Sequence, residues 1–217
     1  MEVHDVVAVA TTSPEDIFAV KVLNLCKAVT AILNGSVLQR EIPIFGAPFH
    51  GIFLMGMIDE IRCDQDTFAL DLVEFKTRNY NSLPSKAQKF NHDLQVIIYK
   101  KLFDDLVSGK TSKQLISNQF QLDLFKPLGA DISAHIQLAD LKNCCTLDAL
   151  LNVLYERMSA VPKIGRMLVE YCYQADRSTI AICEVTTALC DVQSRLDHYV
   201  AYWHGNREVG YCDVMFL

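Results

Sequence analysis

The sequence has no long hydrophobic run. None of its apolar stretches reaches the roughly 18 residues that a helix needs to cross a bilayer. The opening MEVHDVVAVATTSPEDIF has four acidic residues and no basic cluster, which argues against a signal peptide or an Arg-rich transit peptide. With 51% hydrophobic and 21% charged residues over 217 positions, the composition is that of a soluble globular protein. We therefore expect a single domain without a membrane partner.

Spacings that hold zinc or disulfides are also missing. No Cys-x-x-Cys pair occurs among the eight cysteines, and no His-x-x-x-His occurs among the six histidines. The cysteines are Cys26, Cys63, Cys144, Cys145, Cys172, Cys183, Cys190 and Cys212. Several of them stand inside apolar runs such as IAICEV, a setting typical of buried thiols in a reducing compartment. The sequence predicts neither a disulfide framework nor a Cys/His zinc site.

The sequence also lacks an excess of positive charge. The formal net charge is −6, so the chain as a whole does not attract nucleic acid, and a polyanion site would require a local patch. The best candidate is KTRNYNSLPSKAQK, which contains Arg78, Lys86 and Lys89 and lies within an acid-free stretch from 75 to 92. We expect these three side chains to contact a nucleic-acid strand.

The order of elements predicts a mixed α/β fold. A helix is expected over residues 13–35, with Ser13 as N-cap, Pro14 at its first position and Asn34–Gly35 at its end. Strands are expected at 36–46, 51–63 and 67–77, the last two joined as an antiparallel hairpin by the turn at 64–66. Further expected elements are a helix from Pro84 to about Val107, a helix at 146–160 capped by Thr146, a hairpin of 167–176 with 178–185, and a last helix to about 203. The segments 115–125 and 126–129 are ambiguous.

Charged residues end two of the predicted strands. Side chains alternate between the two faces of a strand, so Glu74 and Lys76 share a face with Leu70 and Leu72 in TFALDLVEFKTRNY. On the preceding strand, Asp59 follows Phe53, Met55 and Met57 on what should be an apolar, partly buried face. Carboxylates in such places need compensation, by a raised pKa, a cation partner or a metal ion. The cation partner can be Lys76, as a structural ion pair.

The metal-ion alternative implies phosphodiester hydrolysis. Mg²⁺ prefers one or two carboxylates together with waters and phosphate oxygens, and it lowers the pKa of a bound water. Asp59 and Glu74 would then be ligands, and Lys76 would be the catalytic cation. Gln95 and Tyr99 are four residues apart on one face of the following helix, where they can hold phosphate or base groups. The alternative for Tyr99 is simple packing.

These motifs resemble a known family. The segments MGMIDEI, EFKTR, LPSKAQK, QVIIYKKLFD and HYVAYWHGNRE are similar to the exonuclease V family, a RecB-like branch of the PD-(D/E)XK nuclease superfamily. The resemblance implies a restriction-endonuclease-like α/β core, with a mixed sheet flanked by helices. It also implies a Mg²⁺-dependent (or Mn²⁺-dependent) exonuclease that hydrolyses single-stranded DNA in DNA repair. A nuclear monomer is expected, with mitochondrion or cytoplasm as the alternative location.

The resemblance also assigns roles to individual residues. Asp59, Glu74 and the backbone carbonyl of Phe75 would hold the metal ion, and Lys76 would serve the attacking water. Gln95 and Tyr99 would belong to the extended active site. Arg78, Lys86 and Lys89 are not part of this motif and are assigned on charge alone.

Two family features are not found in the sequence. The family has an upstream helix that brings a His or Glu to the metal, and His4 is a poor substitute for it. The family also has a 4Fe–4S cluster held by four cysteines, whose ligands are absent here, and Cys212 is wrongly placed to replace one. We therefore expect a chain truncated at both ends. The alternative function is that of an inactive fragment that binds nucleic acid or a partner.

Overall fold

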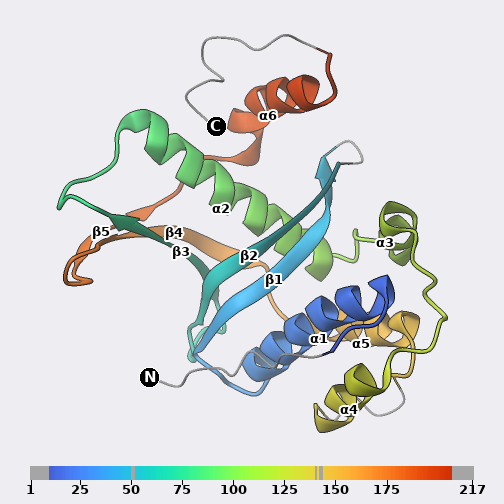
Figure 1. Ribbon diagram of the computed structural model, residues 1–217. Coiled ribbons are helices and arrows are strands. Elements are labelled where there is room, and N and C mark those ends of the chain that lie inside the picture. Colours follow the sequence, from blue (N-terminus) through green and yellow to red (C-terminus); the bar gives the residue numbers. More distant parts are fainter. Residues whose placement is uncertain (1–9, 50–51, 140, 142–143, 207–217) are drawn as a thin grey trace.

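A five-stranded mixed sheet flanked by helices forms the centre of the protein, and it confirms the predicted α/β class (Figure 1). The computed structural model describes residues 10–49, 52–139, 141 and 144–206. The elements are α1 (Pro14–Leu33), β1 (Leu38–Phe49), β2 (Ile52–Cys63), β3 (Leu70–Arg78), α2 (Lys86–Val107), α3 (Lys113–Phe120), α4 (Ala130–Leu138), α5 (Leu147–Ser159), β4 (Ile164–Tyr173), β5 (Thr179–Glu184) and α6 (Leu189–Trp203).

The strands are arranged in sequence order, β1-β2-β3-β4-β5. The pairs β1–β2, β2–β3 and β4–β5 are antiparallel, which confirms both predicted hairpins. β3 and β4 run parallel, and the chain between them passes through α2 to α5. Such a parallel pair requires a crossover of this kind.

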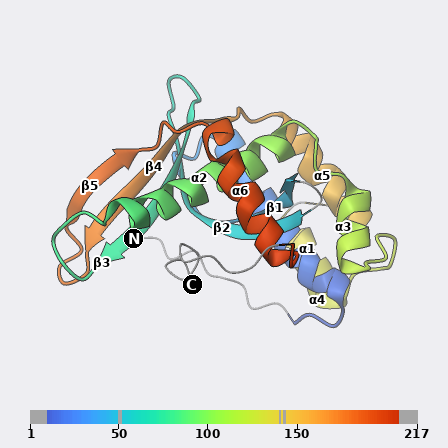
Figure 2. The ribbon, with the colours of Figure 1, turned by 90° about the horizontal axis from the view of Figure 1, so that it is seen from above.

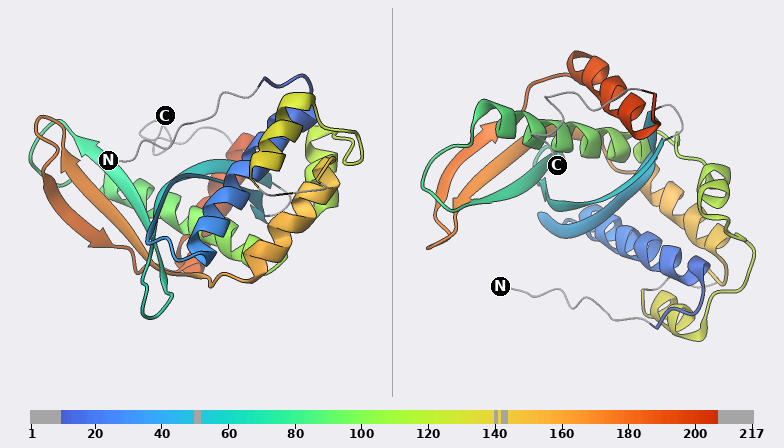
Figure 3. Two further views of the ribbon diagram at one scale, coloured as in Figure 1. Left: turned by 90° about the horizontal axis from the view of Figure 1, so that it is seen from below. Right: turned by 45° about the horizontal axis from the view of Figure 1, so that its top comes forward.

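The β1–β2 hairpin lies between two helices (Figure 3, right). On one face Phe45 packs against Phe18 of α1, with ring centroids 5.1 Å apart. On the other face, a Cβ at Gly46 would meet Leu102 of α2 at 3.2 Å. α6 crosses over α2 on the outer side (Figure 2). Each face of the hairpin therefore packs against a helix over part of its length, which fixes its position relative to α1 and α2.

Helix caps determine where the predicted helices begin. The Ser13 hydroxyl accepts the Asp16 N–H at 3.2 Å, and Thr146 caps α5 in the same way. α2 begins at Lys86, two residues after the predicted start, because Ser85 forms a capping box with Gln88. The predicted boundaries are thus confirmed to within a few residues.

α4 was not predicted. Its N-cap is Gly129, which has no side chain to bond a free N–H group, so the usual start signal is absent from the sequence. α3 lies in the segment that the sequence left ambiguous, and it ends where Gln121 adopts a left-handed conformation with φ of 53°. No helix in the described residues combines the length and apolarity that a membrane span requires.

β2 and β3 pair over only part of their lengths. Their ladder runs from Cys63↔Leu70 to Glu60↔Val73. Beyond that point β2 remains paired with β1 only, and β3 with β4 only. The two strands therefore separate, and the first residues past the separation are Asp59 and Glu74.

Candidate active site

Asp59 closes the fork between the two strands. Its Oδ2 accepts the backbone N–H of Phe75 at 2.8 Å, so the side chain replaces the ladder hydrogen bond that is lost where the strands separate. The expectation of a partly buried apolar face around Asp59 was wrong in part. Met55 and Met57, which precede it on that face, are 49% and 42% exposed. Asp59 is thus half-buried beside an open surface and accessible to solvent.

Glu74 is buried at the other side of the fork, with only 3% of its surface exposed. Its Oε1 accepts hydrogen bonds from Lys76 Nζ at 2.7 Å and from Gln95 Nε2 at 2.8 Å. Lys76 Nζ also donates to Gln95 Oε1 at 2.8 Å. The three side chains form a closed triangle, and the structure brings together the predicted residues from β3 and α2.

The second oxygen of Glu74 lacks a partner. Oε2 is buried and receives no hydrogen bond from any described residue. An unsatisfied buried polar atom carries the full cost of its desolvation, so each one needs a physical explanation. A structural ion pair with Lys76 satisfies Oε1 only. A cation at Oε2 would complete the compensation.

The electrostatics of Glu74 agree with this reasoning. Burial raises the pKa of its carboxyl, and the nearby Asp59 charge raises it further, while Lys76 and Gln95 act in the opposite direction. The net shift is upward, so the positive charge of Lys76 does not fully compensate the carboxylate. Two carboxylates close enough to interact, one of them with an unsatisfied oxygen, fit a divalent cation.

Tyr99 lies one turn beyond Gln95 and packs against β2. A Cβ at Gly56 would lie 2.5 Å from Cε1 of the Tyr99 ring and 2.8 Å from its hydroxyl. Only glycine accommodates the ring so close to the strand. This contact agrees with the packing alternative for Tyr99. Its place in an extended active site stays a prediction.

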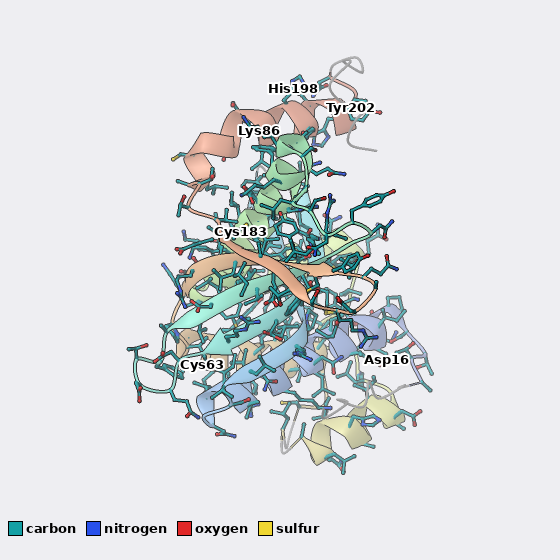
Figure 4. All side chains as sticks on the ribbon, turned by 90° about the vertical axis from the view of Figure 1, so that its left-hand side faces the viewer. Asp16, Cys63, Lys86, Cys183, His198 and Tyr202 are labelled. Atoms are coloured by element: carbon teal, nitrogen blue, oxygen red, sulfur yellow. The ribbon has the colours of Figure 1, made fainter. Side chains whose placement is uncertain are left out.

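The three basic residues differ in their surroundings. Lys89 forms an ion pair with Asp93 at 2.7 Å, just beyond the acid-free stretch. Arg78 donates to Gln88 Oε1 at 3.4 Å. Lys86 is exposed at the start of α2 (Figure 4). Lys86 and Arg78 thus keep charge available for a strand, whereas the charge of Lys89 is largely offset.

His92 belongs to this neighbourhood although the sequence did not indicate it. Its Nδ1 is 3.1 Å from the hydroxyl of Tyr171, and Tyr171 is paired with Lys76 in the β3–β4 ladder. Burial lowers the pKa of His92, and the charges of Lys76 and Arg78 lower it further. The spacing of three from Gln95 on one helix was the available signal. Its partner on β4 could not be identified without the sheet order.

The described residues do not fit an iron–sulfur cluster. No group of three or more His, Cys, Asp or Glu side chains that could hold a metal occurs in the described part of the chain. A magnesium ion needs fewer protein ligands than that, since waters and phosphate oxygens complete its shell. Asp59 and Glu74 fit this smaller requirement. His4 and Cys212 lie outside the described residues.

The mixed sheet and the acid–lysine–glutamine cluster at a strand fork define the class as an α/β protein with a nuclease-like core. Comparisons with known proteins agree. The family profile described as "Exonuclease V - a 5' deoxyribonuclease" matches residues 1–72 and 65–148. The chain is 35% identical over 210 residues to a Danio rerio protein named Exonuclease V. The chain belongs to the exonuclease V family. The alignment covers 96% of this chain and 52% of the relative, so the chain spans about half of that protein's length.

Proposed function

We propose that this chain carries the active site of a metal-dependent exonuclease that hydrolyses single-stranded DNA in DNA repair. The observation that supports it most strongly is the buried, unsatisfied Glu74 Oε2 beside Asp59. The description of the matching family favours DNA as substrate and attack from a 5′ end. A monomer in the nucleus and a RecB-like ancestry complete the proposal.

The metal site would be formed at the strand fork. Asp59, Glu74 and the carbonyl of Phe75 would hold Mg²⁺ or Mn²⁺. When bound, such an ion lowers the pKa of a coordinated water and neutralises charge on the phosphate. Glu74 Oε1 is already used by Lys76 and Gln95, which leaves Oε2 as the oxygen for the ion.

Lys76 supplies a fixed positive charge next to that oxygen. Its amine is held at 2.7 Å by Glu74 and at 2.8 Å by Gln95, so it does not need to reorganise when charge develops on the phosphate. The amine orients the attacking water and stabilises the developing negative charge. Gln95 positions it, because the same amide donates to Glu74 and accepts from Lys76.

The strand would approach along the open side of the fork. Arg78 and Lys86 would contact phosphates there, and Lys89 would join them by exchanging Asp93 for a phosphate. Such contacts to the backbone carry no sequence preference and weaken with salt. The proposal therefore predicts a salt-sensitive enzyme without strong sequence specificity.

The test is cleavage of 5′-labelled single-stranded DNA in Mg²⁺. The chain should release short products, and Asp59→Ala and Lys76→Ala should each reduce the rate by on the order of 10² or more. Lys163→Ala, at an exposed lysine outside the site, should retain the wild-type rate. Unchanged rates in both site variants would refute the residue assignment. Tight binding without cleavage in Mg²⁺ or Mn²⁺ would favour a nucleic-acid-binding module instead.

A further inference from the structure

An apolar hollow opens at β2, the strand that carries Asp59. It has a volume of about 170 Å³ and is bounded by the start of α1, by β2 and by the end of α3. Ile17, Met55 and Phe120 contribute apolar walls, and Lys21 is also one of the lining residues. The hollow is of the size of one heterocyclic base.

Its aromatic wall is held rigidly. Phe120 contacts Phe53 edge to face with ring centroids 5.1 Å apart, and it contacts Phe18 at 5.4 Å. The rim, in contrast, is open to solvent, because Ile17 is 55% exposed and Met55 is 49% exposed. Large apolar side chains that gather at an open hollow are typical of a binding surface.

The hollow and the fork are on one face of β2. The β1–β2 register advances without a shift from Arg40↔Glu60 to Gly46↔Leu54. Side chains alternate along a strand, so Met55, Met57 and Asp59 share a face. At about 3.3 Å per residue, Met55 is about 13 Å from Asp59 along the strand. Met57, which is 42% exposed, lies between them and makes the apolar surface continuous.

We propose that this hollow binds a nucleobase of the single strand whose phosphodiester reaches Asp59 and Glu74. The inference rests on the proposed function and adds a base subsite to it. Proteins that hold single strands without sequence preference combine base stacking with cations along the backbone. Phe120 and the side chains of Met55 and Ile17 supply the apolar contact, and Lys21 supplies a cation for a phosphate. From this hollow the strand would continue over Met57 toward the fork.

The experiment compares how the chain binds single strands with bases and single strands without bases. Binding of a fluorescein-labelled oligothymidylate and of an abasic oligomer of equal length is measured by fluorescence anisotropy in EDTA. The variants are Met55→Ala and Ile17→Ala, whose exposed positions protect the fold from large effects. The matched control is Leu138→Ala on α4. Its apolar side chain is 82% exposed and does not line the hollow.

We expect the wild-type chain to prefer the base-containing oligomer. Each variant should reduce that preference by at least about fivefold and leave the affinity for the abasic oligomer unchanged. Leu138→Ala should behave like the wild type. An unchanged preference in both variants, with cleavage of single strands intact, would overturn the base subsite and leave the proposed function standing.

Two other outcomes would also overturn the subsite. If the wild-type chain neither binds nor cleaves single strands, the proposed function fails and the subsite fails with it. If Met55→Ala and Ile17→Ala change the sedimentation of the DNA-free chain instead, the hollow is a contact between two copies of the chain.

Discussion

Replacing Lys76 with methionine tests the electrostatics of the site without any substrate. The substitution keeps most of the volume of the side chain and removes the ammonium group that bonds Glu74 and Gln95. The Glu74 carboxylate then retains one donor, the Gln95 amide at 2.8 Å. In EDTA, the change should destabilise the fold, because a buried carboxylate loses its cation.

The magnitude follows from the bonds that are lost. A hydrogen bond to a charged group contributes about 1.5–3 kcal/mol, and loss of one partner of a buried pair costs about 3–5 kcal/mol. The Lys76 side chain keeps 22% of its surface exposed, so water compensates part of the loss. We therefore expect the free energy of unfolding to fall by about 2 kcal/mol at about pH 8.

The loss should depend on pH in a defined direction. The pKa of Glu74 is raised in the folded protein, so its effect on stability is most favourable at low pH and becomes unfavourable as pH rises through the folded pKa. Removing Lys76 raises that pKa further. A protonated carboxyl needs no counter-charge, so the cost of Lys76→Met should be smaller at about pH 5 than at about pH 8.

Urea denaturation at the two pH values measures this difference. Lys163→Met, at an exposed lysine away from the site, should stay within about 0.5 kcal/mol of wild type at both. A cost for Lys76→Met that does not change with pH, or one below about 0.5 kcal/mol, would refute the picture of an undercompensated Glu74.

Three further predictions concern stability. The Lys126 hydrogen bond lowers the pKa of Glu15 to about 2, so the stabilisation by Glu15 is present above its ordinary pKa and is lost as pH falls. Glu15→Gln should therefore lower the free energy of unfolding by about 1.5–3 kcal/mol at neutral pH. In urea denaturation at a series of pH values, the variant should lose less stability on acidification than the wild type. Gly56→Ala should cost about 1–3 kcal/mol by displacing the Tyr99 ring, and less in a Tyr99→Leu background, as a double-mutant cycle in urea would measure. Arg62→Ala should cost about 1.5–3 kcal/mol in thermal and urea unfolding, because the buried Glu60 loses one of its two arginine partners and keeps only Arg40.

Much of the fold could be predicted because its signals are local. Ser13 and Thr146 are N-cap residues that mark the starts of α1 and α5, and the turn at Asp64–Asp66 indicates the β2–β3 hairpin. α4 lacked a side-chain cap, and so no local signal marked its start. The parallel pairing of β3 with β4 depends on contacts across the whole α2–α5 segment, which no local pattern encodes.

The same distinction applies to the site. Strand spacing placed Glu74 and Lys76 on one face, and the family resemblance added Gln95 to the same site. The structure brings the three side chains together. The exposure of Met57 and the partnership of His92 with β4 were not predictable, because both depend on how distant elements cover the sheet. The roles of the clustered residues in catalysis stay predictions.

Binding of Mn²⁺ to the chain, followed by electron paramagnetic resonance, tests the central claim most directly. The account predicts one bound Mn²⁺ per wild-type chain, with binding weakened by at least about tenfold in Asp59→Asn and in Glu74→Gln. Leu138→Ala should bind the ion as the wild type does. Equal Mn²⁺ binding by the wild type and both carboxylate variants would contradict the assignment of the metal site to the fork between β2 and β3.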